Sequence, residues 1–179
     1  MKKPRKKKCK VCGEKFQPEQ PIQEWCTIDC AIKLIEIKRD KKRRKETRHR
    51  KEGVKSLSEL LKEAQTAFNS YIRERDKDLP CISCGRHHDG QYHAGHYKTV
   101  GAYPELRYEE LNCHKQCAPC NNHLSGNILE YRKRLIERMG IDGVEWLEGP
   151  HEPKKYTKED AREIKAKYLK LTRELKKGD

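Results

Sequence analysis

The sequence predicts an α+β protein assembled from small zinc-stapled modules and several helices. Only 34% of the 179 residues are hydrophobic and 39% are charged. A single large core is therefore not expected, and metal sites are the physical alternative. Eight of the nine cysteines fall into four close pairs, which is the number needed for two four-cysteine zinc sites. Long helical patterns and one β-prone stretch supply the secondary structure.

The charge of the chain indicates a polyanionic partner. Lysine and arginine number 42 against 28 acidic residues, so the formal net charge is +14. The usual partner of such a field is a phosphate backbone, although ribosomal proteins and proteins at anionic membrane surfaces are also basic. We expect no membrane partner, because the sequence has no run of about 18 apolar residues. No apolar stretch follows "MKKPRKKKCK", so we expect a soluble, intracellular protein whose cysteines bind zinc rather than form disulfides.

Residues 1–31 are expected to form an N-terminal zinc finger. The Cys-x-x-Cys-Gly turn is typical of a zinc knuckle, because glycine permits the tight backbone there. A second cysteine pair begins a helical pattern, and Trp25 precedes it. This arrangement resembles a treble-clef finger. Docking to nucleic acid or protein and a purely stabilising clip are both compatible with it. The four expected zinc ligands are Cys9, Cys12, Cys26 and Cys30.

Residues 32–77 are expected to form a basic helical region. Lysine and arginine dominate residues 35–55, with acidic residues at helical spacing. A solvated linker helix and a phosphate-contacting arm remain open for this stretch. Ser56 and Glu59 predict the capping box of a second helix with a broad apolar face. That face would pack against the next module or against a second subunit.

Residues 78–135 contain the second cysteine set, and residues 136–179 follow as a turn and a helix. In the first segment "QYHAGHYKTV" predicts a strand, "ELRYEELN" a returning strand or loop, and the stretch after Cys117 a helix. In the second, "GIDGVEWLEGPHEP" predicts turns, and Thr157 with Asp160 caps a last helix. The expected ligands of the second structural zinc are Cys81, Cys84, Cys117 and Cys120.

The surplus histidines and asparagines resemble a known motif. Two Cys-x-x-Cys pairs, a central histidine, an asparagine ahead of the second pair and an Asn or His after it resemble a zinc-clamped HNH nuclease motif, also called ββα-metal or His-Me finger. Further stretches, "YIRERDKDLPCISCG", "AGHY" and "HKQCAPCNNHLSGN", closely resemble the NinG (Rap) recombination family of phage lambda. The resemblance extends from Cys9 to about Leu135.

The resemblance implies a structure-specific endonuclease that cuts branched DNA, such as Holliday junctions and D-loops, in the cytoplasm of the host bacterium. Resolution of a four-way junction needs two symmetric cuts, so a homodimer is expected, with residues 31–77 as the natural interface. The rival interpretation is a non-catalytic zinc-finger protein that binds nucleic acid. In that case the histidines are only surface groups.

The motif also implies roles for individual residues. His96 is the expected general base, since a neutral imidazole can take a proton from water at physiological pH. Asn121 would hold a catalytic Mg²⁺ or Mn²⁺, and Asn112 would brace the loop that carries the base. His93 is the next candidate ligand, and His123 is a further ligand or phosphate contact.

The remaining histidines and the ninth cysteine have plainer interpretations. His114 is a weaker site candidate. Cys113 is either a spare zinc ligand or a small buried side chain. The histidines expected to be ordinary surface or core residues are His49, His87, His88 and His151.

Overall fold

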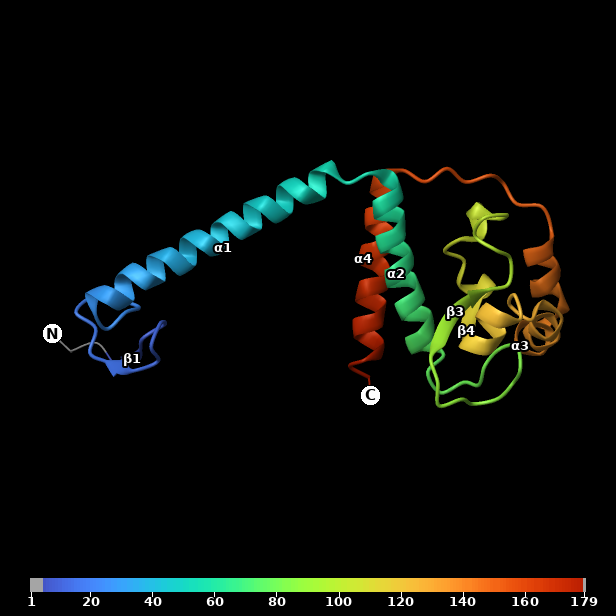
Figure 1. Ribbon diagram of the computed structural model, residues 1–179, viewed down its shortest axis with the longest axis horizontal. Helices are drawn as coiled ribbons and strands as arrows, with labels where there is room; N and C mark the ends of the chain where they lie inside the picture. Colours follow the sequence, from blue (N-terminus) through green and yellow to red (C-terminus); the bar gives the residue numbers. More distant parts are fainter. Residues whose placement is uncertain (1–4, 179) are drawn as a thin grey trace. The chain divides into compact units, whose positions relative to one another are not determined.

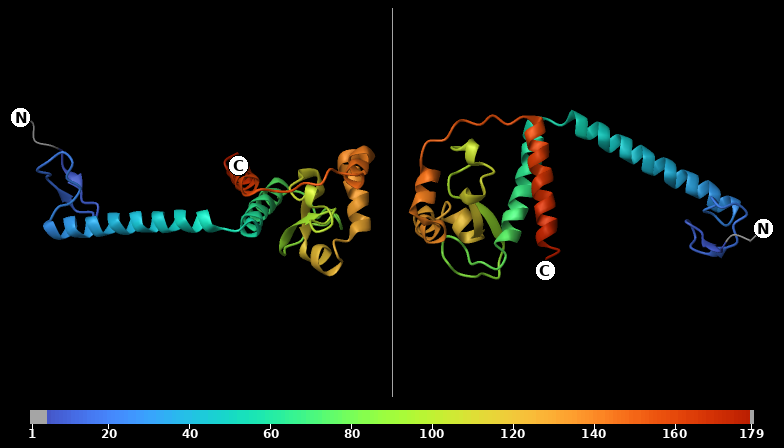
Figure 2. Two further views of the ribbon diagram at one scale, coloured as in Figure 1. Left: turned by 90° about the horizontal axis from the view of Figure 1, so that it is seen from above. Right: turned by 180° about the vertical axis from the view of Figure 1, so that it is seen from behind.

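The computed structural model describes residues 5–178 of the chain and divides it into two compact units, residues 1–55 and residues 56–179. Figures 1 and 2 show the elements of each unit. The units mix helices with two small antiparallel sheets, which confirms the α+β class. The four-segment organisation expected from the sequence stays a prediction.

The first unit is a small finger followed by one long helix. Strands β1 (Lys7–Lys8) and β2 (Lys15–Phe16) pair antiparallel and carry the first cysteine pair between them. Helix α1 (Ile28–Val54) begins where expected, because the hydroxyl of Thr27 accepts a hydrogen bond from the amide of Cys30. The helix buries only one residue, Leu34.

The second unit contains a parallel pair of helices, α2 (Leu57–Arg75) and α4 (Lys158–Leu175). Both predicted capping boxes are present, at the starts of α2 and α4. Lys165 pairs with Glu63 at 2.7 Å, and Lys176 pairs with Glu74 at 3.5 Å. The offset in sequence is the same in both pairs, so the helices run in one direction. Figures 1 and 2 show α4 beside α2 along its length.

A β-hairpin lies against α2. Strand β3 (Tyr92–His96) pairs antiparallel with β4 (Cys113–Cys117) in a regular register. The first strand was predicted. The second lies in "CHKQC" itself, and the preceding "ELRYEELN" forms the loop with two 3-10 turns, η1 (Pro104–Leu106) and η2 (Glu110–Asn112). The loop alternative is therefore the correct one, since Pro104 has no N–H to give to a ladder.

Helix α3 (Ile128–Glu148) differs from the sequence prediction. Residues 141–149 were expected to be turns, but α3 continues through most of them. Gly140 interrupts the helix with φ 80° and ψ 168°, a conformation that suits glycine. The helix resumes because Val144 and Leu147 are completely buried on the core. Burial outweighs the helix-breaking tendency of the glycines here.

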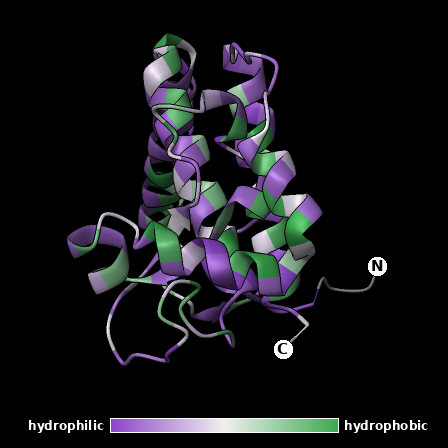
Figure 3. Cartoon of the chain, turned by 90° about the vertical axis from the view of Figure 1, so that its right-hand side faces the viewer, coloured by the Kyte–Doolittle hydropathy of each residue, from purple (hydrophilic) through white to green (hydrophobic). Residues whose placement is uncertain are grey.

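The hydrophobic core of the second unit has three parts. One lies between α2, α4 and the hairpin, the second between α3 and the hairpin loop, and the third around the cysteines. Figure 3 shows green hydrophobic residues alternating with purple hydrophilic ones along the helices. The apolar face of α2 is buried within this unit, so it is not free to form the subunit interface expected there. The buried residues of α2 are Leu60, Ala64, Ala67, Phe68 and Ile72.

Within residues 5–178, none of the helices is both long enough and apolar enough to cross a membrane.

Candidate zinc centres and active site

The first cysteine set has the geometry of a tetrahedral metal site. The four Sγ atoms of Cys9, Cys12, Cys26 and Cys30 lie within 4.8 Å of one another. The Sγ atoms of Cys12 and Cys26 are 3.4 Å apart, and those of Cys26 and Cys30 are 3.7 Å apart. A zinc ion with Zn–S bonds of about 2.3 Å places its sulfurs about 3.8 Å apart. The set could therefore hold zinc without rearrangement.

The second cysteine set joins the start and the end of the hairpin region. Cys81 follows α2, Cys117 ends β4, and Cys120 lies in the single π-helical turn η3 (Pro119–His123). All four Sγ atoms, including that of Cys84, lie within 4.8 Å of one another, and those of Cys84 and Cys117 are 3.9 Å apart. This set could also hold zinc. With four sulfur ligands it leaves no open coordination position for chemistry.

His88 belongs to the surroundings of the second cysteine set, although the sequence analysis treated it as an ordinary surface histidine. Its Nε2 lies 3.1 Å from the Sγ of Cys84, and its amide donates to the hydroxyl of Tyr92 at 2.7 Å. A ring N–H at this distance stabilises the thiolate form of the ligand. The spacing of four residues after Cys84 was the available signal.

His96 ends β3, and one of its ring nitrogens is fixed by the backbone. Its Nε2 lies 3.0 Å from the carbonyl oxygen of Arg107. A carbonyl can only accept, so Nε2 carries the proton and Nδ1 of the neutral ring carries the lone pair. Nδ1 lies 3.6 Å from the Sγ of Cys113, a weak contact for a thiol donor. The backbone thus selects the tautomer whose Nδ1 can act as a base.

Burial keeps the ring of His96 neutral. The ring packs 5.9 Å from that of Phe68 on α2, and burial lowers the pKa of His96 below its ordinary value. The hydrogen bond to the carbonyl of Arg107 raises this pKa, and the charge of the same residue lowers it. Together these effects lower the pKa of His96, so its imidazole is neutral at neutral pH.

Asn112 fixes the loop that separates the two strands. It is completely buried, and its Oδ1 accepts from the amide of Lys98 at 2.7 Å. Its Nδ2 donates to the carbonyls of Lys98 and Leu106 at 3.0 and 3.1 Å. The side chain therefore ties the start of the loop to its middle, directly after the position of His96. This is the geometry that a bracing role requires.

His93 does not join His96 in one ligand set. The register pairs His93 with Gln116 and His96 with Cys113. Side chains alternate between the faces of a strand, so the two imidazoles point to opposite faces of the hairpin, about 10 Å apart along the strand. Nε2 of His93 is buried and has no hydrogen-bond partner among the described residues.

Asn121 and His123 lie together in η3, directly after the second cysteine pair. Nδ2 of Asn121 donates to the Oδ1 of Asn122 at 2.8 Å, which leaves the amide oxygen of Asn121 available as a metal ligand. His123 is exposed. In the part of the chain that the structure describes, the two cysteine sets are the only groups of three or more His, Cys, Asp or Glu side chains that could hold an ion.

His114 supports the strand from behind instead of entering the site. It is 5% exposed, and its Nδ1 lies 3.2 Å from the hydroxyl of Tyr131 on α3. That hydroxyl donates to the carbonyl of Gly95 at 2.9 Å. Burial, assisted by nearby arginine charges, lowers the pKa of His114 to about 3. Tyr131 lies on the apolar face of a helical pattern, which was the available signal for its burial.

Comparison with known proteins identifies one family. The family described as "Bacteriophage Lambda NinG protein" matches residues 1–179. The chain is 42% identical over 194 residues to "Protein ninG" of Escherichia phage 933W, covering 98% of this chain and 96% of the relative. It is 41% identical over 196 residues to that of Salmonella phage P22, covering 98% and 97%. For Escherichia phage lambda the identity is 40% over 196 residues, covering 98% and 96%. No solved structure shows significant similarity.

Proposed function

The chain belongs to the bacteriophage lambda NinG protein family, and from this premise we propose that it is a metal-dependent endonuclease that hydrolyses phosphodiester bonds at branched DNA. The observation that carries the proposal is the state of His96. It is a half-buried, neutral imidazole whose Nε2 is tied to a carbonyl and whose Nδ1 holds the lone pair. A histidine in this state can act as a general base.

The reaction follows from that group. Nδ1 of His96 takes a proton from a water molecule as the water oxygen attacks the phosphorus of the scissile phosphate. The bond from phosphorus to the 3′ oxygen breaks, and the 3′ oxygen leaves with a proton supplied by solvent. The products are a 5′ phosphate and a 3′ hydroxyl. The hydrogen bond from Nε2 to Arg107 keeps the ring oriented and stabilises the imidazolium that forms.

Asn121 is the residue best suited to hold the divalent ion of this reaction. Its amide oxygen is the hard ligand that Mg²⁺ and Mn²⁺ prefer, and it lies on the turn that follows the second cysteine set. When bound, such an ion neutralises charge on the phosphate and on the departing oxygen. His93 would enter from the other face of the hairpin, so it is a weaker candidate than its position in the motif suggested. His123 is a phosphate contact on the exposed side of the turn.

Branch selectivity would come from two copies of this site. Two symmetric cuts in a four-way junction require two active sites related by a two-fold axis. We therefore keep the homodimer as part of the proposal. Its interface would lie outside the apolar face of α2, because that face is buried within one chain.

A second candidate function is non-catalytic binding of nucleic acid through the zinc fingers. Two observations favour it. The described residues offer no histidine- or carboxylate-rich set for a catalytic ion, and the thiol of Cys113 lies beside Nδ1 of His96. The large positive charge serves binding equally well.

Cleavage of synthetic DNA separates the two functions. The purified protein is incubated with a labelled four-way junction and with a linear duplex of the same arm sequence. Each substrate is tested with Mg²⁺, with Mn²⁺ and without added divalent ion. The nuclease proposal expects metal-dependent cleavage of the junction in preference to the duplex. Tight binding without cleavage in every condition would support the second function instead.

A further inference from the structure

The middle of α1 carries the highest positive charge of any helix within residues 5–178. We call residues 38–51 the basic segment. It contains ten basic residues and two acidic ones, which gives a net charge of +8 (10 − 2). The acidic residues are Asp40 and Glu46. The basic residues are Lys38, Arg39, Lys41, Lys42, Arg43, Arg44, Lys45, Arg48, Arg50 and Lys51.

Packing does not explain the basic segment. All ten basic side chains are exposed, and the one buried residue of α1 lies before the segment. The acidic residues form ion pairs along the helix, at 3.0 Å between Arg43 and Asp40 and at 3.9 Å between Lys42 and Glu46. Outside the segment, Glu24 pairs with Lys38 at 2.8 Å. Three acids cannot balance ten bases, and like charges at helical spacing destabilise a helix. A polyanionic ligand would remove that repulsion.

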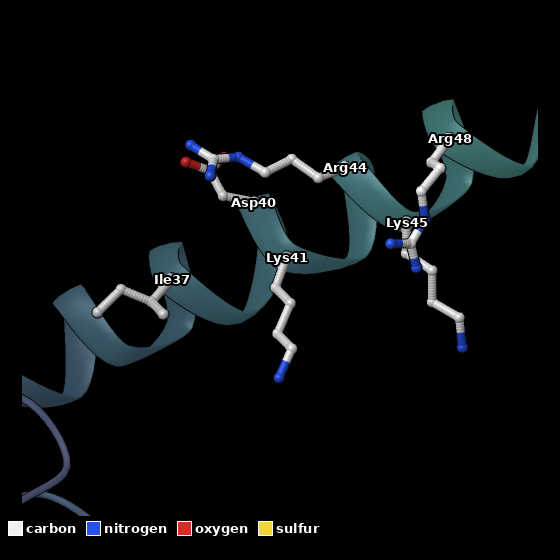
Figure 4. Close-up of a pocket in the computed structure, with 6 residues that line it drawn as sticks. All are labelled: Ile37, Asp40, Lys41, Arg44, Lys45 and Arg48. Atoms are coloured by element: carbon white, nitrogen blue, oxygen red, sulfur yellow. The ribbon is translucent and has the colours of Figure 1, made fainter. Parts of the chain in front are cut away.

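The positive charge surrounds the helix. Lys41, Arg44, Lys45 and Arg48 line a shallow groove together with Ile37 and Asp40, and Figure 4 shows Lys41 and Lys45 projecting from the same side of the helix. At 100° per residue, the opposite side of α1 carries its own row. That row consists of Arg39, Lys42, Arg43 and Arg50.

The distribution of charge selects among anionic ligands. A helix that lies on a membrane needs an apolar face opposite its basic one, and residues 38–51 contain no aliphatic or aromatic side chain. A helix in the major groove of a DNA duplex has a phosphate strand on each side, because that groove is about 12 Å wide and admits an α-helix. Two basic rows on opposite sides match the groove.

We propose that the basic segment binds an arm of duplex DNA, lying in its major groove with one basic row toward each phosphate strand. The segment is about 21 Å long at 1.5 Å per residue, and it would follow about six base pairs at 3.4 Å each. This inference rests on the proposed function for its substrate, branched DNA, and assigns the arm-binding surface. Lysine and arginine contacts to phosphate supply affinity without base sequence preference.

The test compares two charge-matched variants. In the first, Lys41, Arg44, Lys45 and Arg48 are all changed to glutamine. In the control, Lys158, Lys170, Arg173 and Lys177, which are exposed residues on and just after α4, are changed to glutamine. Both lose four positive charges, and glutamine is nearly as good a helix former as lysine or arginine. Circular dichroism and a zinc content equal to that of the wild type establish that both variants are folded.

The readout is binding of a labelled four-way junction, measured by fluorescence anisotropy across a salt series without added divalent ion. Each lost phosphate contact lowers the slope of log K against log salt by about 0.9. The α1 variant should lose about 3 to 4 from the slope and bind at least tenfold more weakly in 100 mM salt. The slope of the control variant should decrease by less than 1. Equal losses in both variants, or an unchanged slope in the α1 variant, would overturn the proposal.

Catalysis is scored separately. Cleavage of the same junction by the wild type is measured with Mg²⁺ or Mn²⁺ added. If the wild type binds but never cleaves, the proposed nuclease function is wrong. A difference in salt slope between the two variants would still support binding of DNA by the basic segment. If the wild type cleaves and the two slopes do not differ, the proposed binding of DNA by the basic segment is wrong, while the proposed nuclease function is supported.

Discussion

The ring of His96 shows how one backbone contact and burial define a chemical group. The carbonyl of Arg107 fixes the tautomer, and the ring packs against that of Phe68. The lowered pKa favours the neutral form, which alone can accept a proton. A histidine at an exposed strand end would share neither property.

The direction of this pKa predicts the pH dependence of cleavage. The base acts only when neutral, and its pKa lies below the ordinary value of about 6.5. As the pH falls, the rate should therefore reach half of its plateau only below pH 6.5. The measurement is the single-turnover rate between pH 5 and 8 at constant bound fraction. A midpoint above pH 6.5 would contradict the assignment of the base.

Asn112 should be important for stability as well as for loop geometry. Replacing it by alanine leaves buried backbone groups of Lys98 and Leu106 without partners. Each unpaired buried group costs about 1–3 kcal/mol, so Asn112→Ala should lower the free energy of unfolding by about 3 kcal/mol in urea titrations. Asn122→Ala, at an exposed neighbouring amide, is the control and should stay within about 0.5 kcal/mol. Similar losses in the two variants would show that the loop does not depend on Asn112.

Single residues were predictable where their spacing is chemically restrictive. Both four-cysteine sets follow from the sequence, because zinc needs four sulfurs in close pairs. The position of His93 and His96 on opposite faces of the strand was also predictable, because residues three apart in a strand point to opposite faces. The burial of His114 was not predictable, because it depends on how Tyr131 of α3 packs behind the strand.

At the scale of elements, the second cysteine set holds the hairpin to the end of α2 and to η3. Replacing one cysteine of this set should therefore release the metal ion, whereas replacing Cys113 should not. Cys113 is completely buried beside Phe68, outside both sulfur sets. Cys113→Ala should keep the wild-type zinc content of about two per chain, and Cys117→Ala should keep about one. Metal analysis of the purified variants measures both values.

The opposite pattern of metal loss, with Cys113→Ala losing an ion, would mean that Cys113 and not Cys117 completes the second site. Equal zinc contents in the wild type, Cys113→Ala and Cys117→Ala would show that the second cysteine set does not bind zinc.

Capped helices were the elements that the sequence predicted best. The Ser56 and Thr157 capping boxes are local, so the residues that form them identify the helix starts. The prediction for residues 141–149 was wrong because glycines dominate the local pattern. The helix persists there through the burial of Val144 and Leu147, which is a long-range effect. The sequence left "ELRYEELN" open between strand and loop and did not indicate β4, since β4 is buried on both faces and shows no alternation.

At the scale of the whole molecule, the chain separates into two units that differ in how they are stabilised. All three core clusters lie within residues 56–179, while residues 5–55 have little core beyond their cysteine set and Leu34. The total charge predicted a polyanionic partner from composition alone. Its concentration in the basic segment is also visible in the sequence, whereas the exposure of these side chains required the structure.

The division predicts that residues 56–179 fold without the first unit. A fragment of these residues should unfold cooperatively in urea, as followed by circular dichroism, and contain about one zinc ion. The full chain should contain about two zinc ions, the second on its finger. A fragment without a cooperative transition would show that the finger and α1 are needed to complete the core of the second unit.

The central claim is that His96 is the base of a DNA-cleaving site. It is tested most directly by the single-turnover cleavage rate of a four-way junction with wild type and His96→Ala, with the bound fraction measured in the same samples. We expect the variant to bind like the wild type and to cleave at least about 100-fold more slowly. Cleavage by His96→Ala at the wild-type rate would rule out His96 as the base.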